Sequence, residues 1–313
     1  MDERLDILKT FKLYIGGAFP RSESGRSEPI VDMTGRVMGH SCKASRKDLR
    51  DAVAAARKAQ PGWRNATAYN RGQVLYRLAE MVEGKRAEFV SLLRDGGAAI
   101  DPEAEVSLSV DRLVYYAGWT DKFAQVTGAQ NPVAGPYWNI TVPEPTGVIG
   151  VVCPAAAGKG GPALLGPALL GPALLGPALL GPALLGLVTL VAPLIAVGNA
   201  VVVISPAYPP VVSVFGEACA TSDLPGGVVN LLTGSLDELA PVLAKHRDID
   251  GLHAAIGDDA AALAKELRLG VAENLKRVMV RQNVEWTDAA ACEGTGWIEP
   301  FVEYKTSWHP VGA

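Results

Sequence analysis

The sequence of 313 residues has few cysteines and few histidines, the usual ligands of zinc. Its four cysteines lie far apart, none in a Cys-x-x-Cys pair, and only four histidines could complete a metal site. This spacing predicts reduced thiols and no metal site. No block of lysine and arginine is interleaved with aromatic residues, and 29 basic against 33 acidic residues give a net charge of −4. We therefore expect no nucleic-acid partner.

Signals for export and for a membrane are also lacking. Residues 1–6 have neither the basic start nor the apolar run of a secretion signal, which predicts a cytoplasmic protein. Residues 187–204 are almost wholly apolar, but no Lys/Arg cluster flanks them. Pro193 and the Gly198-Asn199 pair divide this run into a helix-length piece and a short β-branched piece. We therefore expect a buried helix and strand, and no membrane span.

The most unusual segment is a tandem repeat. Residues 161–185 contain Gly-Pro-Ala-Leu-Leu five times in succession. Proline at every fifth position makes one continuous helix costly, so turns or extended structure are expected. Because the last copy continues directly into Gly186-Leu187, we expect one copy to belong to the domain and four to be a duplicated insertion. A functional apolar segment that binds a ligand is the alternative.

The hydrophobic pattern predicts helices alternating with short strands. One helix is expected from a capping box at Ser45 to about Ala59, where Pro61-Gly62 stops it, and another from Asn70 to Val82. Short strands are expected at residues 13–17, 148–152, 201–204, 228–232 and 249–253. Such alternation is typical of an α/β fold with a doubly wound parallel sheet.

Seven short motifs follow one another along nearly the whole chain. They lie at residues 13–17, 54–63, 144–150, 198–203, 224–234, 274–278 and 301–306. Each is weak alone, but in this order they resemble the aldehyde dehydrogenase family. The resemblance implies a Rossmann-like doubly wound parallel sheet with N-terminal helices and a C-terminal oligomerisation strand.

The resemblance also divides the chain into five segments. These are strands and helices of the cofactor-type domain (1–130), a pairing-strand segment with the entry strand (131–152), the repeat insert (153–186), the Rossmann-like remainder (187–280), and a connector with the oligomerisation strand (281–313).

The chain departs from the family at the catalytic and cofactor-binding positions. Family members use a cysteine nucleophile, an oxyanion-binding asparagine, a glutamate base and a nicotinamide cofactor. Here Cys153-Pro154 is followed by alanines and the repeat, and residues 204–207 lack the Lys and Glu that hold the ribose. Arg281, which cannot accept a proton at neutral pH, stands in the base position. Only a short connector, 284–300, replaces the catalytic domain, so we predict no catalytic residue.

The remaining thiols and histidine have simpler explanations. Cys292, beside Glu293, lacks the basic neighbour that activates a thiol and is expected to be an inert loop cysteine. Cys153 is expected to be an inert core thiol at the end of a buried strand, and His253 to be a structural histidine.

Three residues are candidate cofactor contacts by family position alone: Pro154, Gly257 and Asp258. Asp258 replaces a serine at a phosphate-facing helix start, where its charge would repel a pyrophosphate. Asp258 and Asp259 are equally explained as helix N-caps. We expect no bound cofactor, or NAD or NADP if the family site is retained.

Three functions are consistent with these residues and motifs. The first is a pseudoenzyme that pairs, through an exposed β-edge, with itself or with a full-length aldehyde dehydrogenase. The second is an NAD(P)-dependent oxidoreductase acting on aldehydes through residues that the motifs do not identify. The third is a non-catalytic dinucleotide-binding sensor.

Overall fold

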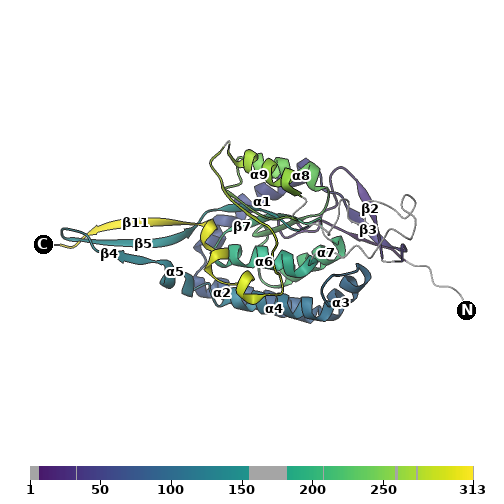
Figure 1. The fold of residues 1–313 in the computed structure, drawn as a ribbon, viewed down its shortest axis with the longest axis horizontal. Helices are drawn as coiled ribbons and strands as arrows, with labels where there is room; N and C mark the ends of the chain where they lie inside the picture. Colours follow the sequence, from purple (N-terminus) through teal and green to yellow (C-terminus); the bar gives the residue numbers. More distant parts are fainter. Residues whose placement is uncertain are drawn as a thin grey trace, which may run out of the picture.

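The computed structural model describes residues 7–32, 34–154, 182–206, 208–257, 260–272 and 274–312. Helices surround a central sheet, and a narrow three-stranded arm projects from this body with the C-terminus near its far end (Figure 1). The strands are β1 (Lys9–Phe11), β2 (Ser27–Val31), β3 (Val37–Cys42), β4 (Ala129–Asn131), β5 (Tyr137–Pro145), β6 (Val148–Val152), β7 (Ala200–Ile204), β8 (Val229–Leu232), β9 (Gly251–Ala255), β10 (Arg277–Arg281) and β11 (Val302–Pro310). The helices are α1 (Arg46–Asn65), α2 (Ala68–Gly84), α3 (Arg86–Asp95), α4 (Pro102–Ala117), α5 (Lys122–Thr127), α6 (Ala183–Ala196), α7 (Pro209–Thr221), α8 (Leu236–Lys245), α9 (Ala261–Ala272), α10 (Ala289–Cys292) and the 3-10 turns η2 (Thr295–Trp297) and η3 (Glu299–Phe301).

The central sheet is parallel throughout, in the order β10-β9-β6-β7-β8. Helices α1, α8 and α9 cover one face, and α6 and α7, backed by α2 and α4, cover the other (Figure 1). Alternate residues of β7 confirm this arrangement, because Val201 and Val203 join the core on the α6 face whereas Val202 and Ile204 join the core on the α1 face. The predicted α/β class with a doubly wound parallel sheet is confirmed.

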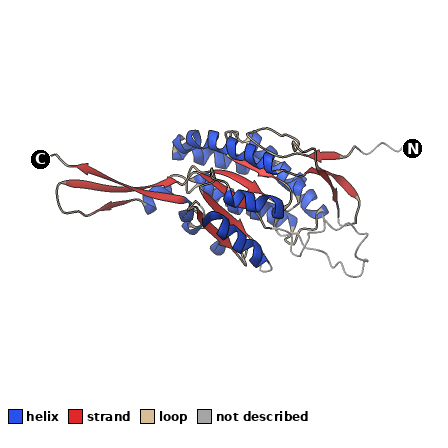
Figure 2. Cartoon of the chain, turned by 90° about the horizontal axis from the view of Figure 1, so that it is seen from above, coloured by secondary structure: helices blue, strands red, loops and turns tan. Residues whose placement is uncertain are grey.

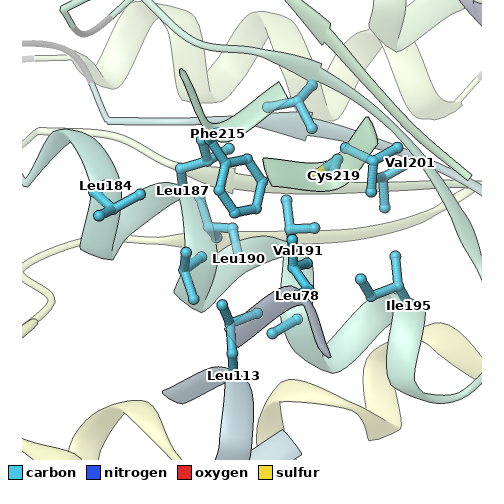
Figure 3. Packing of buried hydrophobic residues seen from close by; sticks show 14 of the residues in the cluster. Leu78, Leu113, Leu184, Leu187, Leu190, Val191, Ile195, Val201, Phe215 and Cys219 are labelled. Atoms are coloured by element: carbon cyan, nitrogen blue, oxygen red, sulfur yellow. The ribbon is translucent and has the colours of Figure 1, made fainter. Parts of the chain in front are cut away.

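Helix α6 lies at the centre of the larger core. All of its residues are buried, and Leu184, Leu187 and Leu190 face side chains of neighbouring helices (Figure 3). The helix begins at Ala183, within the last copy of the repeat and before the predicted end of the insert at residue 186, while the other four copies lie outside the described residues. The predicted sequence of buried helix, turn and buried strand through 187–204 is also confirmed. Within the described ranges, no helix is both long and apolar enough to cross a membrane.

Two local predictions need correction. The capping box at Ser45 and Asp48 is present, but the helix does not stop at Pro61-Gly62 and continues to Asn65. Burial of Trp63, whose Nε1 donates to the Ile195 carbonyl at 2.8 Å, holds this last turn and offsets the proline penalty of about 3 kcal/mol. The second predicted helix is confirmed as α2.

The predicted strand at 13–17 is wrong, because this segment makes only isolated bridges, from Tyr14 to Leu231 and from Ile15 to Ala18. Its glycines form a turn with positive φ, and a turn cannot extend a strand ladder. The other four predicted strands are β6, β7, β8 and, shifted by two residues, β9.

The arm consists of β11, β5 and β4, all antiparallel. Nine residues of β11 pair with nine of β5, from Val302 opposite Pro145 to Pro310 opposite Tyr137. The two views agree that the arm extends well beyond the helices (Figures 1 and 2). The C-terminal strand expected from the family resemblance is therefore present.

Gly227 gives a test of the fold. It has φ +98°, and a Cβ there would lie 2.7 Å from the Ala55 carbonyl oxygen. Gly227→Ala should lower the free energy of unfolding by about 1–3 kcal/mol, measured by urea denaturation. Gly62→Ala is the matched control, because nothing lies within 4 Å of its Cβ and the change should be neutral or stabilising by up to about 1 kcal/mol. Equal effects of the two substitutions would contradict the described turn.

Candidate functional site

Ligands of doubly wound folds bind at the carboxyl edge of the sheet, so the candidate site lies there. Because β6, β9 and β10 are parallel neighbours, Pro154, Gly257 and Arg281 lie along this one edge. Gly257 is exposed, whereas Pro154 is half-buried and lies against Gly186 in the first turns of α6. Asp258 and Asp259 lie outside the described residues.

The side chains that follow β6 and β7 are buried rather than open to a ligand. Cys153 is 1% exposed, and burial raises the pKa of its thiol to about 12, as expected for an inert core thiol. Ser205 is fully buried and Tyr208 is 6% exposed. Ser205 is one of the residues, 204–207, where the family resemblance places the ribose clamp, and its side chain offers no charged group to a ribose. The Lys and Glu that the resemblance expects for the ribose clamp are not among residues 204–207.

Arg281 is held by a cluster of its own. Its Nε donates to His253 Nε2 at 2.8 Å, its Nη2 donates to the Gly296 carbonyl at 2.9 Å, and its guanidinium carbon lies 3.6 Å from the centre of the Trp297 ring. Burial, with the nearby arginine charge, lowers the pKa of His253 well below its usual value, so the ring is neutral and can accept. These contacts hold the guanidinium of Arg281, at the position that the family resemblance assigns to the base, and His253 has the structural role predicted for it.

Glu105 lies at the N-terminus of α6, and no sequence motif singled it out. Its Oε1 accepts the backbone N–H groups of Leu184 at 2.8 Å and Leu185 at 3.2 Å, and the side chain is fully buried. A free helix N-terminus at this edge is a ready anion site. Here the chain's own carboxylate takes that place.

Arg112 lies seven residues after Glu105 on α4 and fixes residues 282–301, here called the connector, which join β10 to β11 and include the predicted connector, 284–300. It is 1% exposed, and its Nη1 donates to Thr189 Oγ1 at 3.0 Å and to the Cys292 carbonyl at 3.2 Å. Its Nε lies 3.4 Å from Glu293 Oε1. The Tyr116 hydroxyl donates to the same Cys292 carbonyl at 3.2 Å. A buried arginine on α4 therefore joins α6 to the connector.

The connector covers the core with large side chains. Trp297, Ile298 and Phe301 are buried in the cluster that contains α6, and Trp286 packs against it. The prediction of a loop cysteine was wrong for Cys292, which ends α10 and is buried, so that its pKa is raised by burial. Only the spacing of Glu105 and Arg112, seven residues apart among buried apolar positions, could have revealed these anchors.

The fold is an α/β fold with a doubly wound parallel sheet. A family model, "Aldehyde dehydrogenase family", matches residues 19–155 and 182–281, and the chain belongs to this family. The match omits residues 156–181, which contain the first four copies of the repeat.

Individual relatives agree. The chain is 31% identical to aldehyde dehydrogenase family 2 member B4, mitochondrial, of Arabidopsis thaliana, over 85% of this chain and 45% of the relative. It is 30% identical to the cytosolic 10-formyltetrahydrofolate dehydrogenase of Mus musculus, over 79% of this chain and 26% of that protein. The NAD+ complex of an aldehyde dehydrogenase from Bacillus cereus superposes with a TM-score of 0.73 at 24% identity. The match covers 88% of this chain and 51% of that chain. The chain spans about half the length, or less, of these relatives.

Replacing Arg112 tests how strongly the connector is held. Arg112→Met keeps most of the side-chain volume but removes the hydrogen bonds, and should lower the free energy of unfolding by about 2–4 kcal/mol in urea. Arg50→Met, at an exposed ion pair with Asp51, should change it by less than about 1 kcal/mol. If Arg112→Met were as mild as Arg50→Met, the connector would not depend on this side chain.

Glu105 gives a test by pH. Burial raises its pKa in the folded state, against the opposing effect of the Leu184 and Leu185 N–H groups. The folded protein therefore holds this proton more tightly than the unfolded chain, and stability falls as the pH rises from the ordinary glutamate range through the folded pKa. Glu105→Gln remains neutral and can still accept both N–H groups, so its advantage over the wild type should grow as the pH rises from the ordinary glutamate range through the folded pKa.

Urea titrations across this range measure that difference, with Glu103→Gln as a carboxyl-to-amide control on the same helix. A wild type that gains on Glu105→Gln as the pH rises would show that the pKa is lowered instead.

Proposed function

We propose that this chain is a non-catalytic member of the aldehyde dehydrogenase family that acts by association, with a second copy or with a full-length aldehyde dehydrogenase. The observation that carries the proposal is the connector. Residues 282–301 follow β10 and cover the core with Trp286 and Trp297. Arg112 holds this segment through the Cys292 carbonyl. The fold is thereby completed by groups that have no role in aldehyde chemistry.

The cysteines support the absence of catalysis. All four, Cys42, Cys153, Cys219 and Cys292, are buried and free. Burial raises the pKa of Cys153, Cys219 and Cys292, which disfavours the thiolate that would attack an aldehyde. Arg281 in its cluster cannot act as a base. An aldehyde-oxidising activity, the second function considered, would need a nucleophile that none of these thiols provides.

The third function, a dinucleotide-binding sensor, has support only from the fold. Against it stand the buried Ser205 and Tyr208 and the carboxylate of Glu105 at the α6 N-terminus. We propose that neither NAD nor NADP is needed for the work of this chain.

The arm supports association. Strand β11 lies at an edge of its sheet, and no strand among the described residues pairs with its outer side. Trp138 and Trp308 on the arm are more than half exposed. An unpaired edge with large apolar side chains is typical of a surface that binds another chain.

A calorimetric titration of the purified chain with NAD and NADP tests the proposal. We expect no heat of binding at millimolar cofactor, with circular dichroism showing folded protein and a full-length aldehyde dehydrogenase as the positive control. Binding near micromolar affinity would favour the sensor, and NADH formation with an aldehyde would favour the enzyme.

A further inference from the structure

A groove lies between α2 and the end of α4, on the side of these helices that faces solvent. The two helices lie side by side and antiparallel (Figure 1), because Gly72, in the first turns of α2, faces Thr120, just past the end of α4. A Cβ at Gly72 would lie 2.7 Å from Thr120 Oγ1, so this glycine permits the close approach. The groove has a volume of about 760 Å³, which is within the range of small-molecule sites.

The walls of the groove carry exposed apolar side chains. Tyr69 and Tyr76 lie two turns apart on α2, and their exposed fractions are 70% and 53%. Val114 of α4 lines the groove as well and is 40% exposed. Large apolar side chains gathered around a hollow in the surface are typical of a site that binds a ligand.

The carboxylates of the groove lie toward its two ends. Asp121 lies at the end where Gly72 packs against α4, and Glu80 lies about 12 Å further along the axis of α2. Neither carboxylate makes a hydrogen bond or an ion pair with another residue in the described ranges. The guanidinium of Arg77, which lies between them along α2, is already paired with Asp223 at 3.0 Å.

The groove therefore offers one anion toward each end of an apolar channel. Lys122, beside Asp121, lies over the ring of Trp119, 5.4 Å from its centre, and does not line the groove. A ligand that complements this pattern has two cations separated by an apolar chain. Ammonium groups also interact favourably with the faces of tyrosine rings.

We propose that this groove binds an extended aliphatic diamine, with its two ammonium groups at Glu80 and Asp121. The methylene chain lies against Tyr76 between them. The site is separate from the carboxyl edge of the sheet, because it lies near the opposite end of α6. There, Arg71 of α2 donates to the carbonyl of Ala196, the last residue of α6, at 3.0 Å. The inference goes beyond the proposed function and does not rest on it.

Calorimetric titrations of the full chain test the proposal. We expect octamethylenediamine to bind with a dissociation constant of about 0.1–1 mM. Octylamine has the same chain but one ammonium group, and should bind about 2- to 5-fold more weakly because it makes only one exposed ion pair. The affinity for the diamine should also fall as the salt concentration rises from about 0.05 to about 0.5 M.

Substitutions at the two ends locate the site. Glu80→Gln and Asp121→Asn should each lower the affinity for the diamine to about that of octylamine for the wild type, since each leaves one ion pair. Glu266→Gln, at an exposed position of α9 on the other face of the sheet, is the matched control and should change the affinity by less than about twofold. Circular dichroism checks that each variant is folded.

Three results would overturn the proposal. An absence of binding heat at millimolar diamine would show that the groove is no such site. Equal affinities for the diamine and octylamine would show that the second carboxylate has no part in binding. A Glu80→Gln variant that binds the diamine as tightly as the wild type would place the ligand elsewhere.

Discussion

The buried guanidinium of Arg112 is the contact on which the closed form of this chain depends. It lies among α4, α6 and the connector, and it bonds the side chain of Thr189 and the backbone of Cys292. A buried arginine is costly unless its donors are used, so its position fixes the connector against the body. With the connector fixed, Trp297 and Phe301 complete the core above α6.

At the carboxyl edge of the sheet, too, polar side chains are held by other groups of the same chain. Glu105 meets the first N–H groups of α6, and Arg281 is held between His253 and Trp297. In each case a polar group of the chain satisfies a position that could otherwise attract a ligand. The family fold is thus retained, while the groups at its site bind one another. The arm, in contrast, leaves the outer side of β11 unpaired and Trp138 and Trp308 more than half exposed, in the described part of the chain.

Much of the fold could be predicted from the sequence, because buried strands and amphipathic helices leave periodic patterns. Strands β6, β7 and β8 and helix α2 lie close to where these patterns place them. The passage of α1 through Pro61 could not be predicted, since it depends on a tertiary contact of Trp63. The contacts of Glu105 and Arg112 could not be predicted, because they join residues about 80 and 180 positions apart in the sequence. The cytoplasmic location, the five-segment division and the roles of Pro154, Gly257 and Asp258 stay predictions.

Hydrogen exchange of the backbone amides in α6 tests the central claim most directly. If the connector seals the core, these amides exchange only through global unfolding, as slowly as those of β6 and β7. Exchange of α6 within seconds under native conditions, while β6 and β7 stay protected, would show that the core is open on the connector side. That result would contradict the view that the chain closes its own fold.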